Sequence, residues 1–331
     1  MPPRVSVLVP TYNYARYLPE ALDSVLAQQF TDFELIISDD ASTDNSAEIL
    51  RRYAARDARI RYQVHPKNLG MVANWNWCLN EARGEYIKYL FGDDRLSSPL
   101  ALGTLVTMLE KNPAAVLAVS ARNIIDEQSR IVDCWDQLGE SGVHSGRAVG
   151  RRCLLRAVNY VGEPSVVLFR ASQATRGFDT SYRQIVDLEM WCHLLRGGDL
   201  VYTREPLCQF RCHAVQQTAV NRQQQRGEKE YPLLFAEHMD YFLPAGAAFP
   251  PEELNHVFLR VFHMRRDLRS NLRHDITPEA KTITELLMSR LGRGRYFRLW
   301  LRRRLTRPFL NFWRFWHKHV LHRPLPPCCA S

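Results

Sequence analysis

Apolar segments of two alternating kinds fill the first hundred residues. Short runs rich in β-branched residues are typical of strands, and stretches with apolar residues three and four positions apart are typical of helices. The predicted strands cover residues 5–9, 33–38, 60–64 and 86–91, and the predicted helices cover residues 17–29, 42–53 and 72–82. Such alternation is characteristic of βαβ units, in which helices join parallel strands and cover both faces of the sheet. The chain is therefore predicted to be an α/β protein.

Two pairs of adjacent aspartates stand where predicted strands end. Asp39-Asp40 follows the second predicted strand, and Asp93-Asp94 follows the fourth. An isolated Asp-Asp pair is common in solvated turns, but ligands of open α/β sheets bind just beyond the carboxyl ends of the strands. Neighbouring carboxylates also repel each other unless a cation lies close by. The repetition therefore favours one site that holds a metal ion and a polar ligand.

The rest of the chain continues the alternation less regularly. Helices are predicted at residues 100–111 and 187–196, and strands at residues 114–121, 166–169, 200–202 and 207–211. Residues 126–150 are polar and carry no strong signal of either kind. Beyond about residue 216 the apolar spacing becomes helical, most clearly over residues 252–272.

Positive charge is concentrated at the carboxyl end. The chain has 331 residues and a net charge of +9, with 44 Lys and Arg against 35 Asp and Glu. Of these basic residues, 11 follow Glu285, and no acidic residue does, so the remainder is close to neutral. We therefore expect an α/β domain over residues 1–215, a helical extension over residues 216–285 and a basic tail rich in aromatic residues over residues 286–331.

Seven short motifs, in this order, resemble those of one known family. They are Val5–Asn13 (VSVLVPTYN), Ser38–Asp44 (SDDASTD), Asn68-Leu69-Gly70, Gly84–Ile87, Asp93-Asp94, Gly177-Phe178-Asp179 and Asp187-x-Glu189-x-Trp191. Together they make residues 3–215 similar to the family 2 glycosyltransferases. The resemblance implies the GT-A fold, which binds nucleotide sugars on a Rossmann-like, mixed and mainly parallel sheet with helices on both faces. The helical extension would follow that domain.

The resemblance assigns a nucleotide-sugar site to the first half of the chain. Its residues would be Pro10, Thr11, Tyr12, Asp39, Asp40, Asn68, Gly70 and Asp93. The first three would lie beside the base. Asp39 or, preferably, Asp40 would accept a hydrogen bond from the N–H of uracil, and Asp93 would hold the ribose or the metal.

A divalent metal, Mn²⁺ or Mg²⁺, is also implied, with Asp94, Asp93 and His213 as its protein ligands. Mg²⁺ is typically held by one or two carboxylates together with substrate phosphates, so a single acidic pair is sufficient. The ion would stabilise charge on the departing diphosphate. His213 belongs to an Arg-x-His pattern seen in non-processive members, and a structural role for this histidine is equally open.

Asp187 would be the catalytic base. A sugar hydroxyl is a poor nucleophile, so a carboxylate within about 3 Å must take its proton during the attack. One base and one leaving group give a single displacement that inverts the anomeric centre. Taken alone, an acid at a helix start is more often explained by the helix dipole. On the acceptor side the resemblance places Glu163, Pro164, Glu189 and Trp191.

Two positions depart from the family pattern. Phe91 stands two residues before Asp93, where the family often has an acid, and Val186 precedes the base, where an acid is also common. These departures affect the metal site and the surroundings of the base, but not the nucleotide site.

We therefore expect an inverting, metal-dependent, non-processive glycosyltransferase. It would move one sugar from a nucleotide-diphosphate sugar, preferably a UDP-sugar, to a saccharide or lipid-linked saccharide in glycan or cell-envelope polysaccharide synthesis. A nucleotidyltransferase is one alternative, although residues 10–16 lack the glycine-rich, basic phosphate loop of that class. An inactive scaffold that binds membrane or nucleic acid is the other.

The sequence also predicts where the protein works. The first apolar run is too short for a signal peptide, and 18 apolar residues nowhere run together, so a cytoplasmic enzyme is expected. The tail mixes Arg with Phe and Trp, which suits an anionic membrane surface, nucleic acid or a helix packed on the main domain. Because many family members act on lipid-linked acceptors, the inner face of the cytoplasmic membrane is favoured and no nucleic-acid partner is expected. The oligomeric state is left open.

Overall fold

The computed structural model describes residues 2–213, 226–243, 285, 288 and 292–300. The chain forms two compact units, Met1–Leu243 and Pro244–Ser331. In the second unit, residues 293–300 are helical. The helix predicted over residues 252–272 and most of the predicted tail lie outside the described residues.

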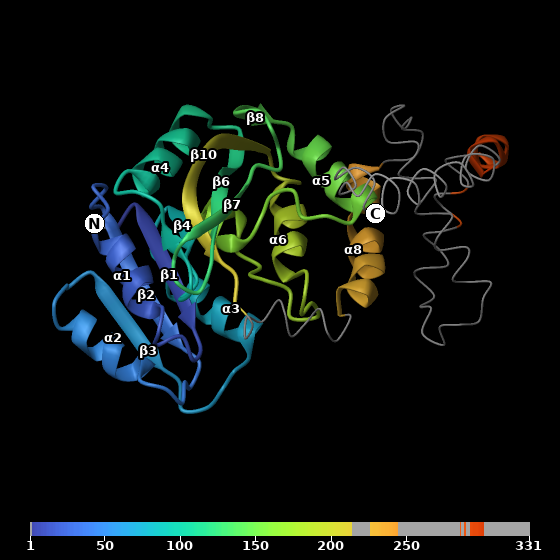
Figure 1. Cartoon of the computed structure of the whole chain (residues 1–331). Helices are drawn as coiled ribbons and strands as arrows, with labels where there is room; N and C mark the ends of the chain where they lie inside the picture. Colours follow the sequence, from blue (N-terminus) through green and yellow to red (C-terminus); the bar gives the residue numbers. More distant parts are fainter. Residues whose placement is uncertain (1, 214–225, 244–284, 286–287, 289–291, 301–331) are drawn as a thin grey trace, which may run out of the picture. The chain divides into compact units, whose positions relative to one another are not determined.

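Strands and helices alternate through the first half of the first unit (Figure 1). The elements are β1 (Val5–Thr11), α1 (Leu18–Leu26), β2 (Phe33–Asp39), α2 (Ser46–Ala54), β3 (Ile60–Val64), α3 (Met71–Glu81) and β4 (Tyr86–Tyr89). Every residue of β1, β2 and β4 is buried, so both faces of this part of the sheet are covered. The predicted alternation is confirmed, with small shifts at the ends of the elements.

The second half of the unit is less regular. Its elements are β5 (Arg95–Leu96), α4 (Ala101–Lys111), β6 (Ala115–Ile125), β7 (Ile131–Trp135), β8 (Gly142–His144), α5 (Gly146–Arg156), β9 (Val167–Arg170), α6 (Val186–Leu194), β10 (Asp199–Arg211) and α8 (Arg226–Phe242). Residues 126–150, which carry no strong sequence signal, contain β7, β8 and the start of α5. Most of β7 and β8 is exposed, so no buried face imposes an alternating pattern on these strands.

The two strands predicted at residues 200–202 and 207–211 are a single strand, β10. Its pairing with β6 is irregular on both sides of Pro206. Proline has no N–H to donate to a strand ladder, so it is accommodated at a bulge. The prediction of two separate strands was therefore wrong, because the pairing with β6 becomes irregular at this proline but the chain stays in the sheet.

In the described part of the chain, ten strands form one mixed sheet in the order β3-β2-β1-β4-β9-β6-β10-β5, with β7 beside β6 and β8 beside β10. Parallel pairing joins β1 to β2 and β4, β2 to β3, and β6 to β10. Strand β9 runs antiparallel between β4 and β6. The predicted α/β fold class, a mixed sheet covered by helices, is confirmed.

Helix α8 packs against α5 and α6, away from the end of the unit that carries α1 and α2 (Figure 1). Gly150 of α5 permits this approach, because a Cβ at that position would run into the ring of Phe242. The first unit therefore includes α8, and the three-part division of the chain stays a prediction. None of the helices in the described part of the chain is both long and apolar enough to cross a membrane.

The topology brings four chain segments to one edge of the sheet. Thr11 at the end of β1 pairs with Asp39 at the end of β2, and β4 lies on the other side of β1. Gln209 of β10 pairs antiparallel with Arg95, directly after the acidic turn. The residues that follow β10 are therefore placed beside Asp93 and Asp94.

Candidate active site

The loops that follow β1 and β2 form one hydrogen-bonded structure. The backbone N–H of Asn13 donates to Ser42 Oγ at 2.8 Å, and the N–H of Thr43 donates to Asn13 Oδ1 at 2.8 Å. Asn13 has a φ of 57°, a left-handed conformation that asparagine tolerates better than most residues. This linkage explains why the two motifs occur together. Tyr12, directly after β1, is 45% exposed.

Asp39 and Asp40 are both buried, but their carboxylates differ. One oxygen of Asp39 accepts hydrogen bonds from the hydroxyl and N–H of Ser42. Its other oxygen, Oδ2, is buried and has no hydrogen-bond partner among the described residues. Burial raises the pKa of Asp39. An acceptor without a partner at a strand end is the feature that a ligand N–H would satisfy.

Asp40 instead holds the next turn of the chain. Its two oxygens accept the N–H groups of Leu69 at 2.6 Å and Gly70 at 3.1 Å, and its C=O accepts from the amide of Asn68. Gly70 has a φ of 89°, which favours glycine. Asn68 and Gly70 therefore occupy the polar atoms of Asp40. The geometry favours Asp39 over Asp40 as the carboxylate that would accept a hydrogen bond from a nucleobase.

The acidic turn after β4 presents Asp93 to the residue that follows β10. Oδ2 of Asp93 lies 3.0 Å from His213 Nε2. Nδ1 of the same histidine is buried without a hydrogen-bond partner in the described part of the chain. The phenol of Tyr14 lies near Asp93, and burial together with the charge of Asp93 raises the pKa of Tyr14. Asp93, His213 and Tyr14 thus form one polar cluster at the strand ends.

Asp94 lies deeper, with both carboxylate oxygens already engaged. Oδ2 accepts from the hydroxyl of Ser165 at 2.5 Å, and Oδ1 accepts from the N–H of Arg211 at 2.9 Å. Burial and the neighbouring charge of Asp93 raise its pKa well above the ordinary value. The two aspartates are therefore not equivalent, and Asp93 is the better placed of the pair to meet a metal ion.

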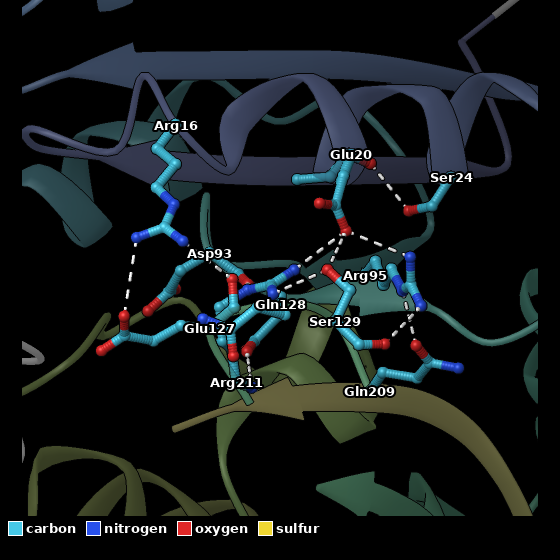
Figure 2. Close-up of polar contacts among 12 residues, drawn as sticks. Arg16, Glu20, Ser24, Asp93, Arg95, Glu127, Gln128, Ser129, Gln209 and Arg211 are labelled. Carbon is cyan, nitrogen blue, oxygen red and sulfur yellow. Dashed lines mark hydrogen bonds and ion pairs between the residues drawn. The ribbon is translucent and has the colours of Figure 1, made fainter. Parts of the chain in front are cut away.

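Arg211 holds the acidic turn from below (Figure 2). Its side chain is fully buried, and Nε donates to the C=O of Asp93 at 2.8 Å. The other guanidinium nitrogens reach Glu20 of α1 at 3.0 Å and the hydroxyl of Ser129 at 2.8 Å. A buried cation of this kind needs several partners to offset its desolvation. Arg211 therefore ties the turn to α1 and to the hairpin between β6 and β7.

Asp187 stands in the first turn of α6, where the N–H of Leu188 donates to Oδ1 at 2.8 Å and the amide of Asn159 donates to Oδ2 at 2.9 Å. Burial and the charge of Glu163 raise its pKa to about 7. Such a carboxyl group is a stronger proton acceptor than an ordinary aspartate when ionised.

The Glu163-Pro164 segment lies between Asp187 and the acidic turn. Glu163 accepts from Arg122, whose Nε lies 2.7 Å from Oε2, and its charge raises the pKa values of both Asp94 and Asp187. Pro164 is buried at the start of a short 3₁₀ turn. Glu163 therefore acts electrostatically on both halves of the site, and its role on the acceptor side stays a prediction.

Glu189 and Trp191 are in the interior, which corrects the expectation that they face an acceptor. Both side chains are fully buried. Glu189 takes a bidentate contact from Arg176 at 2.7 and 2.9 Å, and Trp191 Nε1 donates to the C=O of Gly162 at 2.8 Å. Asp187, Glu189 and Trp191 all lie on α6, but of the three only Asp187 is partly exposed. Their role is to anchor the helix that carries Asp187.

Three positioning groups could not be assigned from the sequence. Asn159 and Ser165 lie in none of the motifs, and Arg211 is marked only as the first residue of the Arg-x-His pattern. Each is identified by its hydrogen bonds to a carboxylate or carbonyl far away in the sequence. Of the three, only Arg211 has a local sequence signal, because it belongs to the Arg-x-His pattern.

Solved structures share this architecture. The TarS fragment 1–349 of S. aureus superimposes with a TM-score of 0.57 at 16% identity, over 89% of this chain and 80% of that one. Its complex with UDP gives 0.58 at 17% identity, over 84% and 77%. At this identity the likeness concerns the fold alone. The fold, with its acidic residues at the strand ends, is that of the GT-A glycosyltransferases.

Sequence comparison matches part of the chain to one family. Residues 6–152 match the model of Glycosyl transferase family 2. An uncharacterized protein of Mycobacterium tuberculosis, MT1568, is 33% identical over 207 residues, which are 58% of this chain and 62% of that protein. The glycosyltransferase EpsJ of Bacillus subtilis is 43% identical over 100 residues, 30% of this chain and 29% of that one. Chondroitin synthase of Escherichia coli is 26% identical over 232 residues, 70% and 32% of the two chains. Residues 6–152 thus match glycosyltransferase family 2, and the chain spans less than two thirds of the length of each of these relatives.

Proposed function

We propose that this protein transfers a single sugar from a nucleotide-diphosphate sugar to a hydroxyl of a saccharide or lipid-linked saccharide, with inversion at the anomeric carbon. One observation carries the proposal. A carboxylate–imidazole pair, Asp93 and His213, follows the strand ends, and a separately held carboxylate, Asp187 in the first turn of α6, has a pKa raised to about 7; the charge of Glu163 acts on both Asp94 and Asp187. The first is suited to a metal-bound diphosphate and the second to removing a proton.

The donor base would lie over the ends of β1 and β2. Tyr12 offers an exposed ring for stacking, and the unpartnered oxygen of Asp39 offers an acceptor for a base N–H. Uracil has such an N–H, and TarS of S. aureus has been crystallised with UDP and with UDP-GlcNAc. We therefore propose a UDP-sugar as the donor.

Asp93 and His213 fit a divalent metal such as Mn²⁺ or Mg²⁺. Carboxylate oxygen and imidazole nitrogen are ordinary ligands of Mn²⁺. Among the residues that the structure describes, Nδ1 of His213 is buried and makes no second hydrogen bond. When bound, the ion supplies Lewis-acid stabilisation of the departing diphosphate. Asp94 would support the turn from behind, because both of its oxygens already accept hydrogen bonds.

Asp187 would act as the base. Its ionised carboxylate takes the proton of the acceptor hydroxyl while that oxygen forms a bond to the anomeric carbon, and the bond from this carbon to the diphosphate oxygen breaks. The Asn159 amide and the Leu188 N–H orient the carboxylate. One displacement of this kind inverts the configuration.

The proposal is tested by binding first and chemistry second. Thermal shift with UDP-, GDP- and dTDP-sugars, each with Mn²⁺, Mg²⁺ or EDTA, should give the largest stabilisation for a UDP-sugar with metal, because ligand binding to the folded state raises apparent stability. Slow hydrolysis of that donor should follow, and it should disappear in Asp187→Asn. Absence of stabilisation by every nucleotide sugar, in either metal, would reject the proposal.

A further inference from the structure

The segment between α5 and β9, residues 159–165, contacts both halves of the proposed site. We call it the bridging segment. At its first residue, Asn159 donates to Asp187, and at its last, Ser165 donates to Asp94. These two carboxylates are 93 positions apart in the sequence. A single segment of seven residues therefore spans from one to the other.

Asn159 has all of its amide groups engaged. Nδ2 donates to Asp187 Oδ2 at 2.9 Å and to the C=O of Gly162 at 3.0 Å. Oδ1 accepts the N–H groups of Val161 at 3.1 Å and Gly162 at 2.9 Å. Because two backbone donors fix the position of the amide oxygen, only the NH₂ group can face Asp187. The contact favours the ionised carboxylate and opposes the effect of burial on it.

Ser165 bonds to the acidic turn and to the strand β4 before it. Its hydroxyl donates to Asp94 at 2.5 Å and accepts from the N–H of Phe91 at 3.1 Å. Its C=O accepts from the buried ammonium of Lys88. Ser165 itself is fully buried. Because no water competes for these bonds, displacement of Ser165 would leave buried polar groups unpaired.

The middle of the segment is also constrained. Gly162 has a φ of 110°, and a Cβ there would lie 2.7 Å from Val166 and 3.0 Å from the guanidinium of Arg122. The C=O of Gly162 accepts from Trp191 on α6, the helix that carries Asp187. Glu163 is paired with Arg122 of β6. The segment is thus attached to α6, to the sheet and to the acidic turn.

We propose that the bridging segment fixes the distance between the base and the diphosphate-binding turn, with Asn159 and Ser165 as the positioning residues at its two ends. The inference rests on the proposed function. Its physical basis is the steep dependence of proton transfer and displacement on geometry, since a shift of about 1 Å can cost about 10²-fold in rate. Each end should therefore have its own kinetic signature.

The Asn159 end is tested with Asn159→Asp and Asn159→Ala. Aspartate keeps the acceptor for the N–H groups of Val161 and Gly162, but it replaces the donor to Asp187 with a second carboxylate, whose charge opposes ionisation of the base. We expect kcat for hydrolysis of the donor to fall about 10- to 100-fold, with the affinity for UDP in Mn²⁺ unchanged. In Asn159→Ala, loss of the donor raises the pKa of Asp187, so the acid limb of kcat moves to higher pH.

Other groups around Asp187 do not produce this shift. Glu163 of the segment is paired with Arg122, which both variants retain. Cys153 of α5 faces Asp187 as well, but burial raises the pKa of Cys153 to about 11, so the thiol stays neutral between pH 5 and 9. A second readout needs no turnover: with a still higher pKa at Asp187, the Tm of Asn159→Ala should fall more between pH 5 and pH 8 than that of the wild type.

The Ser165 end is tested with Ser165→Ala. Here the affinity for UDP in Mn²⁺ should weaken about 10-fold, while the acid limb of kcat stays where it is in the wild type. Asn112→Ala and Ser181→Ala are matched controls, because each removes a similar local hydrogen bond, to Met108 and Asp179 respectively, outside the bridging segment. Both controls should leave kcat and UDP affinity unchanged.

Equal losses of rate and of UDP affinity in the Asn159 and Ser165 variants would overturn the inference, because a merely structural segment would affect both alike. Wild-type kcat and pH profile in Asn159→Asp, with Asp187→Asn inactive, would overturn the inference and leave the proposed function intact. Full activity of Asp187→Asn would instead reject the base assignment on which both depend.

Discussion

Asp93 and Asp94 are neighbours in the chain, yet their carboxylates have different surroundings. Asp93 meets His213 and Tyr14, whereas both oxygens of Asp94 are held by Ser165 and Arg211. Function at this scale is decided by which lone pairs are left for a ligand.

Substitution of the two aspartates should therefore have unequal effects. Asp93→Asn should lower the affinity for UDP in Mn²⁺ about 100-fold or more, because a metal ligand is lost. Asp94→Asn should cost about 10-fold, the range for groups behind the ligands, since its amide can still pair with the Ser165 hydroxyl. Isothermal titration with UDP, with and without Mn²⁺, measures both. A larger loss of UDP affinity in Asp94→Asn than in Asp93→Asn would indicate that Asp94, not Asp93, is the metal ligand.

Asp187 should link activity and stability to pH in opposite directions. Burial raises its pKa from 3.8 to about 7. The folded protein therefore holds this proton more tightly than the unfolded chain, and the stability it gains is present below pH 3.8 and lost as pH rises to about 7. Turnover, which needs the ionised form, should rise over the same range and level off above it.

Asp187→Asn separates the two effects. This variant cannot ionise at position 187, so its Tm should fall less than that of the wild type between pH 5 and pH 8, while transfer drops by about 10²-fold or more. Paired thermal melts at the two pH values, with UDP titration as a check on the fold, measure this. Parallel Tm curves for the two proteins would show that the pKa of Asp187 is close to its value in the unfolded chain.

At the scale of elements, α8 completes the unit by packing on α5 and α6. Its approach depends on the missing side chain at Gly150. Helix propensity alone favours alanine over glycine at an interior helical position, so the tertiary contact and the local preference oppose each other here.

Gly150→Ala should destabilise the protein for this reason. The new methyl group would overlap the ring of Phe242, and such overpacking typically costs about 1–3 kcal/mol. Gly103→Ala in α4 is the matched control: its Cβ would meet Phe30 at an ordinary 3.5 Å, so stability should rise by about 0.4–1 kcal/mol. Urea unfolding of both variants tests the packing. A stabilised Gly150→Ala would mean that α8 does not dock in this way.

At the scale of the whole molecule, the second unit, Pro244–Ser331, ends in a basic tail. The tail after Glu285 carries 11 basic residues and no acidic one. Cationic segments gain about 1 kcal/mol per Lys or Arg at an anionic membrane surface, and salt screens this attraction.

A chain that ends at Glu285 should therefore bind UDP in Mn²⁺ like the full chain but lose affinity for anionic vesicles. The full chain should bind such vesicles less as salt increases, and Trp313→Ala with Trp316→Ala should remove the part of binding that salt does not abolish. Co-sedimentation with vesicles that contain phosphatidylserine measures this. Equal binding by the truncated and full chains would assign membrane affinity elsewhere.

The sequence alone determined the α/β alternation, the acidic strand ends and the family motifs, because apolar periodicity and turn chemistry are local properties. Tertiary structure decided the rest. It joined the two predicted strands across Pro206 and paired the exposed strands β7 and β8 with β6 and β10. It also buried Glu189 and Trp191. It also chose between adjacent aspartates: Asp39 keeps a free oxygen while Asp40 does not, and Asn159 and Ser165 become site residues. These outcomes depend on hydrogen bonds between residues far apart in the chain, and no local pattern specifies which partners will meet.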